Sequence, residues 1–238
     1  MSWTDAASWA EPTLHLVFWP LATIAAYALA KKVHRRWHFW WTGPLLLTPL
    51  AVLALLAALG ANYGQYMSGT HWLVLMLGPA TVAFAIPIHE QRTVIRRHWP
   101  VLLVGVLAGS TIALGSAWAL AHALDVPDTI GRSLMPRSTT TPFAMAVSGE
   151  IGGVPQLTAV FVILTGVCGA AMGEVMLKWL PLRSTLARGA LFGMAAHGAG
   201  VAKAHEIGRE EGSIAGLVMI LAGLLNLLLA PLVMLALS

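Results

Sequence analysis

Long apolar runs, joined by short segments that hold most of the charged residues, are the feature that most limits how this chain can fold. Such runs occur at about 13–30, 43–62, 71–90, 100–124, 154–180 and 213–237. A helix needs ~20 mostly apolar residues to cross a bilayer, so each run predicts a membrane-spanning helix. Only 10% of the 238 residues are charged, whereas soluble domains have about 25%. We predict an all-α integral membrane protein with one transmembrane domain over residues 1–238.

The charged residues between the runs indicate which way the spans point. Basic residues follow the first, third and fifth runs, at Lys31, Lys32, Arg35, Arg36, Arg92, Arg96, Arg97, Lys178, Arg183 and Arg188, whereas Asp125 and Asp128 follow the fourth. Because cytoplasmic loops are enriched in Lys and Arg, the basic loops are expected inside and both termini outside. The first 13 residues contain no Lys or Arg, so they lack the basic region of a signal peptide and are expected to be retained.

The net charge of +4 and the single cysteine raise two further questions: whether the protein binds nucleic acid, and whether it contains a disulfide or a Cys-based metal site. A basic balance often accompanies nucleic-acid binding, but here the basic residues stand at the ends of apolar runs, where they set topology. We therefore predict no nucleic-acid binding. Cys168 lies inside an apolar run, which excludes an intrachain disulfide and argues against a Cys-based metal site.

Two segments in the second half of the chain do not fit a simple span. Residues 136–153 and 187–212 are interrupted by Gly or Pro, and each has only roughly ten to fourteen uncharged residues, too few to cross the bilayer. On the predicted topology the first enters from outside and the second from inside. Short, interrupted segments at corresponding places in two halves indicate a transporter's binding site. The third run is also interrupted, by Pro79 and Pro87, which predict a kink or an unwound turn.

The predicted architecture is therefore a helical bundle of about six full spans plus two broken or re-entrant segments. Residues 1–132 form the N-terminal spans, and residues 133–238 form a motif-bearing half that contains both broken segments. The two opposed broken segments would also fit an inverted repeat.

A run of hydroxyl side chains lies directly before Pro142. The run comprises Ser138, Thr139, Thr140 and Thr141. Pro favours the first turn of a helix and a hydroxyl residue is a good N-cap, so the run predicts a helix start. Four hydroxyls exceed what one cap requires, and a helix N-terminus with spare donors also suits a carboxylate. Arg137 could supply the counter-charge, or it could be a topology or headgroup residue.

Four further polar residues are candidates for the same site. Glu150 could carry protons within the membrane, or it could be solvated at a turn among glycines. His197 could shuttle protons or hold an anion, or it could be a buried residue bonded to a backbone carbonyl. Lys203 is a second candidate partner for an anion, and Asn226 is either interhelical glue or site lining.

From these residues we predict a substrate-binding set and a coupling set. The substrate-binding residues are Arg137, Ser138, Thr139, Thr140, Thr141, His197, Lys203 and Asn226, and the proton- or ion-coupling residues are Glu150 and His197. The sequence contains no Gly-rich phosphate loop with its Lys, no paired-His zinc motif and no Gly-x-Ser-x-Gly elbow. We predict that the protein is not an enzyme and needs no metal or cofactor.

Three stretches of the sequence resemble the LrgB/CidB family of bacterial membrane proteins, which has the plastid glycolate/glycerate translocator as a plant relative. They are LGPATVAFAIPI at 77–88, PRSTTTPFAMAVSGEIGGVPQLTAVFVILTG from residue 136, and ARGALFGMAAHGAGVAKAHEIGREEGSIAGL from residue 187. The resemblance implies a multi-pass protein of the bacterial inner membrane. It also implies a small companion membrane protein of the LrgA/CidA type.

The resemblance implies two competing functions. One is transport of small monocarboxylates such as pyruvate, glycolate or glycerate, which agrees with the organic-anion site predicted from the residues. We therefore predict a secondary transporter or channel for small organic anions across the bacterial inner membrane, with the second function as the alternative. The other is a holin-like or antiholin-like role that modulates membrane integrity and murein hydrolase export or activity. The expected partners are thus a small organic anion, membrane lipids and, because small transporters commonly pair, a second copy of the chain in a homodimer.

Overall fold

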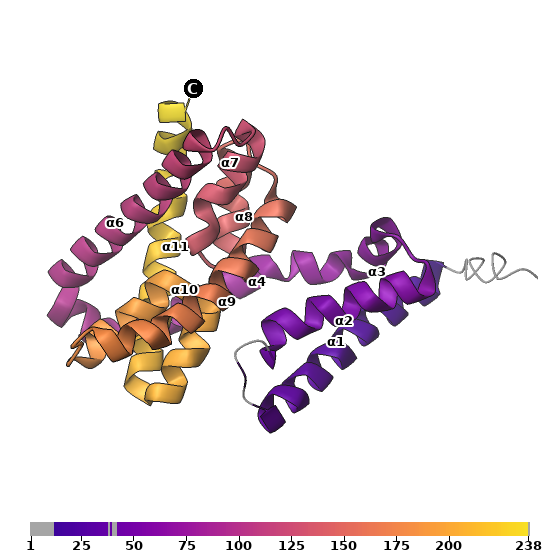
Figure 1. The fold of residues 1–238 in the computed structure, drawn as a ribbon, viewed down its shortest axis with the longest axis horizontal. Helices are drawn as coiled ribbons and strands as arrows, with labels where there is room; N and C mark the ends of the chain where they lie inside the picture. The colour runs from indigo at the N-terminus through magenta and orange to yellow at the C-terminus, as the bar shows by residue number, and fades with distance from the viewer. Residues whose placement is uncertain (1–11, 38, 40–41, 238) are drawn as a thin grey trace, which may run out of the picture. The chain divides into compact units, whose positions relative to one another are not determined.

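The computed structural model describes residues 12–37, 39 and 42–237, and all the regular elements of this part of the chain are helices (Figure 1). In chain order they are α1 (Pro12–Trp37), α2 (Pro44–Leu59), α3 (Tyr63–Leu75), α4 (Leu77–Ala83), α5 (Ala85–Glu90), α6 (Arg92–Ala123), α7 (Asp128–Leu134), the 3₁₀ helix η3 (Met135–Ser138), α8 (Thr141–Glu150), α9 (Pro155–Trp179), α10 (Thr185–Ile207) and α11 (Arg209–Leu237). The chain divides into two compact units, residues 1–80 and 81–238.

Five of the six predicted spans are confirmed, nearly in place. Within the part of the chain that the structure describes, five helical stretches are long and apolar enough to cross a membrane: Leu16–Trp37, Tyr63–Glu90, Arg92–Ala123, Pro155–Trp179 and Arg209–Ala236. The remaining predicted span, the second run at 43–62, is shorter than expected, because Gly60 ends α2 in a left-handed conformation (φ 63°). Its helix has 16 residues, so it is about 24 Å long at 1.5 Å per residue.

The third span is divided at the places that its prolines predict. α3 begins with a capping box, in which the side chains of Asn62 and Gln65 each accept a backbone N–H of the other residue. α4 and α5 then follow as short helices that contain Pro79 and Pro87. Within the first unit, α1 packs against α2 and α3, with the ring of Trp19 edge-on to Tyr66 at 5.6 Å.

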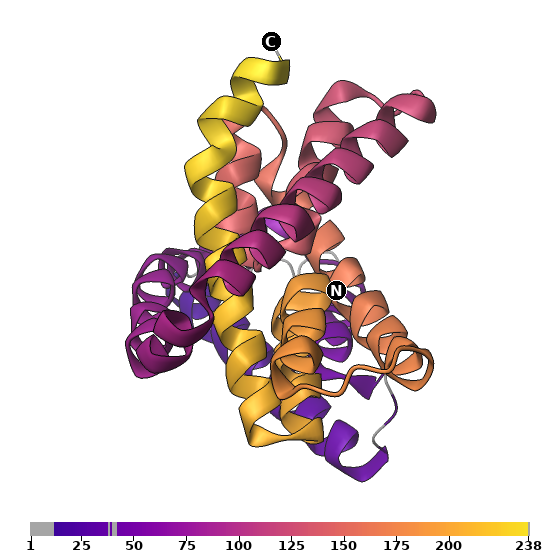
Figure 2. The same cartoon turned by 90° about the vertical axis from the view of Figure 1, so that its left-hand side faces the viewer.

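α11 is the helix around which the second unit is built. It contacts α5, α6, α8 and α10, and Figure 2 shows α6 crossing it obliquely. The crossing is apolar, because Leu102 and Val106 of α6 share a buried cluster with Leu217 and Val218 of α11. The two broken segments lie along this helix, so α11 links them.

Candidate functional site

The hydroxyl run lies where η3 gives way to α8. Thr139 is extended (φ −104°, ψ 154°) and Thr140 is the N-cap of α8, with Pro142 in the first turn. The predicted helix start is therefore present. The side chain of Thr140 makes no capping hydrogen bond. Its hydroxyl, which is half-buried, is thus not used by the helix start.

The hydroxyl of the preceding residue, Thr139, is hydrogen-bonded to α11. Asn226 Nδ2 donates a hydrogen bond of 2.7 Å to Thr139 Oγ1, and both residues are buried. Phe143, one turn into α8, packs against Gly223 on the same face of α11. A hydrogen bond and an aromatic contact therefore help to hold the first break to α11.

The second predicted broken segment is interrupted at His197. This residue has φ 36° and ψ −123°, which separates α10 into a first half ending at Ala196 and a second half beginning at Gly198. Such a conformation is strained for a residue with a side chain and clusters at functional sites in proteins. The imidazole is buried, lies against Gly166 of α9 and is within hydrogen-bonding reach of the backbone of Val162.

The structure brings the two broken segments into one neighbourhood. η3, which includes Arg137 and Ser138, contacts α6, α9 and α10. α8 itself packs against α9 and α11. The predicted end of the second segment is corrected, because Gly208 ends α10 and residues 209–212 already belong to α11.

Several buried polar atoms around these breaks have no hydrogen-bond partner. In the described part of the second unit they are Ser110 Oγ, Arg137 Nη1, Arg188 Nε, His197 Nε2 and Asn226 Oδ1. An unpaired polar atom in an apolar environment is costly. Arg188 Nε lies in the first turn of α10, away from the break at His197. The other four atoms come from α6, η3, the break in α10 and α11, which meet around η3 or through the Thr139–Asn226 bond. Together they offer a guanidinium, a hydroxyl, an imidazole and an amide oxygen to water or to a polar solute.

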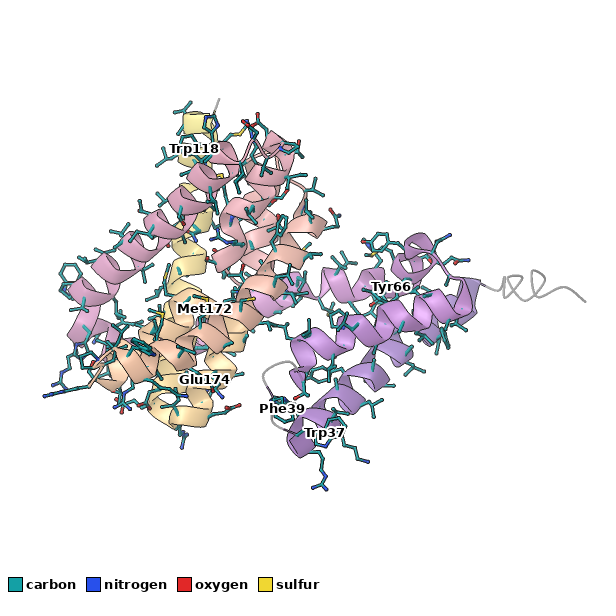
Figure 3. All side chains as sticks on the ribbon, in the orientation of Figure 1. Trp37, Phe39, Tyr66, Trp118, Met172 and Glu174 are labelled. Atoms are coloured by element: carbon teal, nitrogen blue, oxygen red, sulfur yellow. The ribbon has the colours of Figure 1, made fainter. Side chains whose placement is uncertain are left out.

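Two candidate residues lie apart from this set. Glu150 is the last residue of α8 and is exposed, as in the predicted alternative in which it is solvated at a turn. Lys203 forms ion pairs with Glu174 of α9 and, at 2.6 Å, with Glu206. Figure 3 labels Glu174 on α9. The ammonium group of Lys203 is thus occupied by two carboxylates, and both residues stay predictions as far as function is concerned.

A second polar cluster lies at the far end of α8 and was not predicted from the sequence. Thr158 Oγ1 lies 2.9 Å from the carbonyl of Ser133 and 2.7 Å from Ser148 Oγ, while Ser133 Oγ accepts the backbone N–H of Val154. All three hydroxyl residues are fully buried. They tie α7, α8 and α9 together where the chain turns. For Thr158 and Ser110, a hydroxyl residue inside an apolar run is the only signal in the sequence, whereas Ser133 and Ser148 lie outside these runs.

The described residues form only helical elements, with five stretches long and apolar enough to span a bilayer and two interrupted segments between the last three of them. These features define a multi-pass membrane protein. Comparison with known proteins then specifies the family. The model of the LrgB-like family matches residues 23–236, and the chain belongs to this family. The resemblance stated from the sequence is thereby confirmed.

The relatives span the chain nearly end to end. The uncharacterized protein YwbG of Bacillus subtilis is 42% identical over 209 residues, which are 88% of this chain and 93% of YwbG. The antiholin-like protein LrgB of Bacillus subtilis is 28% identical over 93% of this chain and 96% of its own length. The holin-like protein CidB of Staphylococcus aureus is 29% identical over 90% of this chain and 94% of its own length. No solved structure matches.

Proposed function

We propose that this protein modulates the permeability of the membrane, in the sense for which its holin-like and antiholin-like relatives are named. The observation that supports this proposal is the similarity to LrgB and CidB over at least nine tenths of the chain. In its fuller form the proposal includes an effect on murein hydrolase export or activity. No catalytic step by the chain itself is part of it.

Expression of the chain in a bacterial host tests this function. A holin-like protein should dissipate the membrane potential and release dyes of unrelated structure, without saturation, and an antiholin-like protein should suppress such leakage when a pore-former is present. Murein hydrolase activity in the medium is measured in parallel. An unchanged membrane potential, dye retention and hydrolase activity in both settings would contradict the proposal.

A second candidate function is passage of small organic anions, and a specific observation favours it. Arg137 Nη1, His197 Nε2 and Ser110 Oγ are buried without partners beside the two helix breaks. Arg137 would meet a carboxylate, and the hydroxyl and imidazole would complete its hydrogen bonds. Monocarboxylates such as pyruvate, glycolate and lactate fit this chemistry.

Uptake of these labelled acids into proteoliposomes tests the second candidate. Arg137→Gln should raise the half-saturation concentration roughly ten- to hundredfold, because a hydrogen bond to a charged group is worth about 1.5–3 kcal/mol. His197→Ala and Thr140→Ala should also weaken uptake. The matched control is Arg183→Gln, since Arg183 is exposed. Non-saturable flux that Arg137→Gln does not change would favour the holin-like function instead.

The expected assembly is also a proposal. We propose a homodimer in the bacterial inner membrane that acts beside a small companion of the LrgA/CidA type. Cross-linking in native membranes, followed by co-purification of a tagged chain with an untagged copy and with the companion, measures both interactions. A tagged chain that retains neither would contradict the proposed assembly.

A further inference from the structure

A pocket of about 290 Å³ opens beside the second half of α10, on the side toward α5 and α11. Its polar lining comes from three elements: Glu90 and Gln91 at the end of α5, His205 of α10 and Ser213 of α11. None of these residues belongs to the set of unpaired atoms around the breaks, so the pocket is a separate feature.

The pocket changes from polar to apolar along its length. Glu90 and His205 are exposed, whereas Met219 and Ile220 are buried. Val201 also lines it, and this residue lies about one helical turn beyond His197. The volume is well above the roughly 10–15 Å³ that one water molecule requires. The pocket therefore has a solvent-exposed polar rim and an apolar inner wall, which includes Val201 near the break in α10.

We propose that this pocket is the water-filled mouth through which small polar solutes reach the α10 break, and that Glu90 sets the charge preference at its rim. The inference rests on the proposed function, that the protein controls passage of solutes. Arg92, Arg96 and Arg97 follow the same rim in the chain, so the rule that basic loops lie inside places the mouth on the cytoplasmic side. The carboxylate of Glu90 favours cations and disfavours anions at the entrance.

Modification of introduced cysteines by a membrane-impermeant thiol reagent tests the mouth. In a Cys168→Ala background, Ser213→Cys and Gly216→Cys place thiols in the pocket, and a Cβ at Gly216 meets only Val201 at 3.9 Å. Ala222→Cys, buried on the same helix, is the dry control. In inverted vesicles both pocket thiols should react at least about tenfold faster than the control, because an apolar environment suppresses the reactive thiolate.

Equal rates for Gly216→Cys and Ala222→Cys would overturn the proposal. If Gly216→Cys fails to fold, Val201→Cys probes the same inner wall from α10 with the same expected rate. The thiol assay needs no transported solute. Fast labelling of a chain that passes no solute would therefore refute the proposed function and leave the water-filled pocket, whereas slow labelling of a chain that passes solutes would refute the pocket alone.

The charge preference has its own test in the Ser213→Cys chain. Glu90→Gln should raise the rate with an anionic reagent and lower the rate with a cationic one, each by roughly threefold, because a unit charge about 7 Å away in water acts with about RT. Asp125→Asn is the matched control, since Asp125 is exposed and follows the end of α6 that lies farthest from Glu90. A ratio of the two rates that Glu90→Gln does not change would refute the assignment to Glu90.

Discussion

The amide nitrogen and the amide oxygen of the Asn226 side chain have different surroundings. Its Nδ2 donates to Thr139 across the contact between α11 and the first break, while its Oδ1 is buried without a partner. The amide thus acts as interhelical glue through one atom and leaves the other open to water or a solute. The alternatives that the sequence left open for this residue apply to different atoms of one side chain.

The strength of this contact can be measured by a double-mutant cycle. Thr139→Val and Asn226→Leu keep the approximate shape of each side chain and remove the hydrogen bond. Their effects on the free energy of unfolding should differ from additivity by about 0.6 kcal/mol, and by no more than about 1.7 kcal/mol, the range for such bonds between membrane helices.

The cycle is measured by thermal or denaturant unfolding of the protein in detergent. Thr111→Val is the control, because Thr111 is exposed on α6. Strictly additive effects would mean that the bond between Thr139 and Asn226 contributes nothing.

At the scale of the element, α10 depends on glycines at the positions where backbones meet. A Cβ at Gly193 would overlap the carbonyl oxygen of Ala215 on α11, and a Cβ at Gly200 would overlap that of Phe192 within α10 itself. Residues eight apart in a straight helix are about 12 Å from each other. The break at His197 therefore folds the second half of α10 back toward the first, and this arrangement leaves no room for a side chain at Gly200.

This packing predicts a sharp contrast between two neighbouring glycines. Gly200→Ala should destabilise the protein by at least about 1–3 kcal/mol, because overpacking against backbone cannot be relieved by a side-chain rotation. Gly198→Ala should be close to neutral, since no atom lies within 4 Å of the added carbon.

Melting temperature and the yield of monodisperse protein in detergent check this contrast. The two substitutions share the same chemistry and lie two positions apart. Equal melting temperatures for the two variants would show that the halves of α10 do not fold back on each other.

At the scale of the whole molecule, each of two spans is followed by an interrupted segment that we predict not to span. α6 is followed by the break at Thr139, and α9 by the break at His197. A segment that enters and leaves on the same side puts α6 and α9 in opposite directions. This order agrees with the predicted inverted repeat, which stays a prediction.

The same order predicts that both termini lie outside the cell. The basic loops after α1, before α6 and after α9 should lie inside. Reporter fusions measure this: a phosphatase that is active only outside should be active when fused after Ser238 and inactive when inserted after Leu182. A fluorescent protein that matures only inside should show the opposite pattern. An active phosphatase at both positions would contradict the topology.

Much of this architecture follows from the sequence alone, because the free-energy cost of moving charged groups and backbone into lipid depends on the local composition of the chain. Five of the six spans, the interruptions at Pro79, Pro87 and Pro142, and an interrupted segment within 187–212 could be predicted from runs of apolar residues and their Gly and Pro content. The length of α2 could not, since Gly60 and Asn62 together decide where one helix ends and the next begins.

Which polar groups are available to a solute was decided only by the tertiary structure. Lys203 is engaged by Glu174, Thr139 is bonded to Asn226 at a separation of 87 residues, and Ser110 is buried without a partner. A hydrogen bond or ion pair depends on which side chains the packing brings within about 3 Å, and no local pattern encodes that choice. The free energy of transfer into lipid is set by the composition of each segment, whereas the hydrogen bonding of buried polar atoms depends on how the folded helices pack.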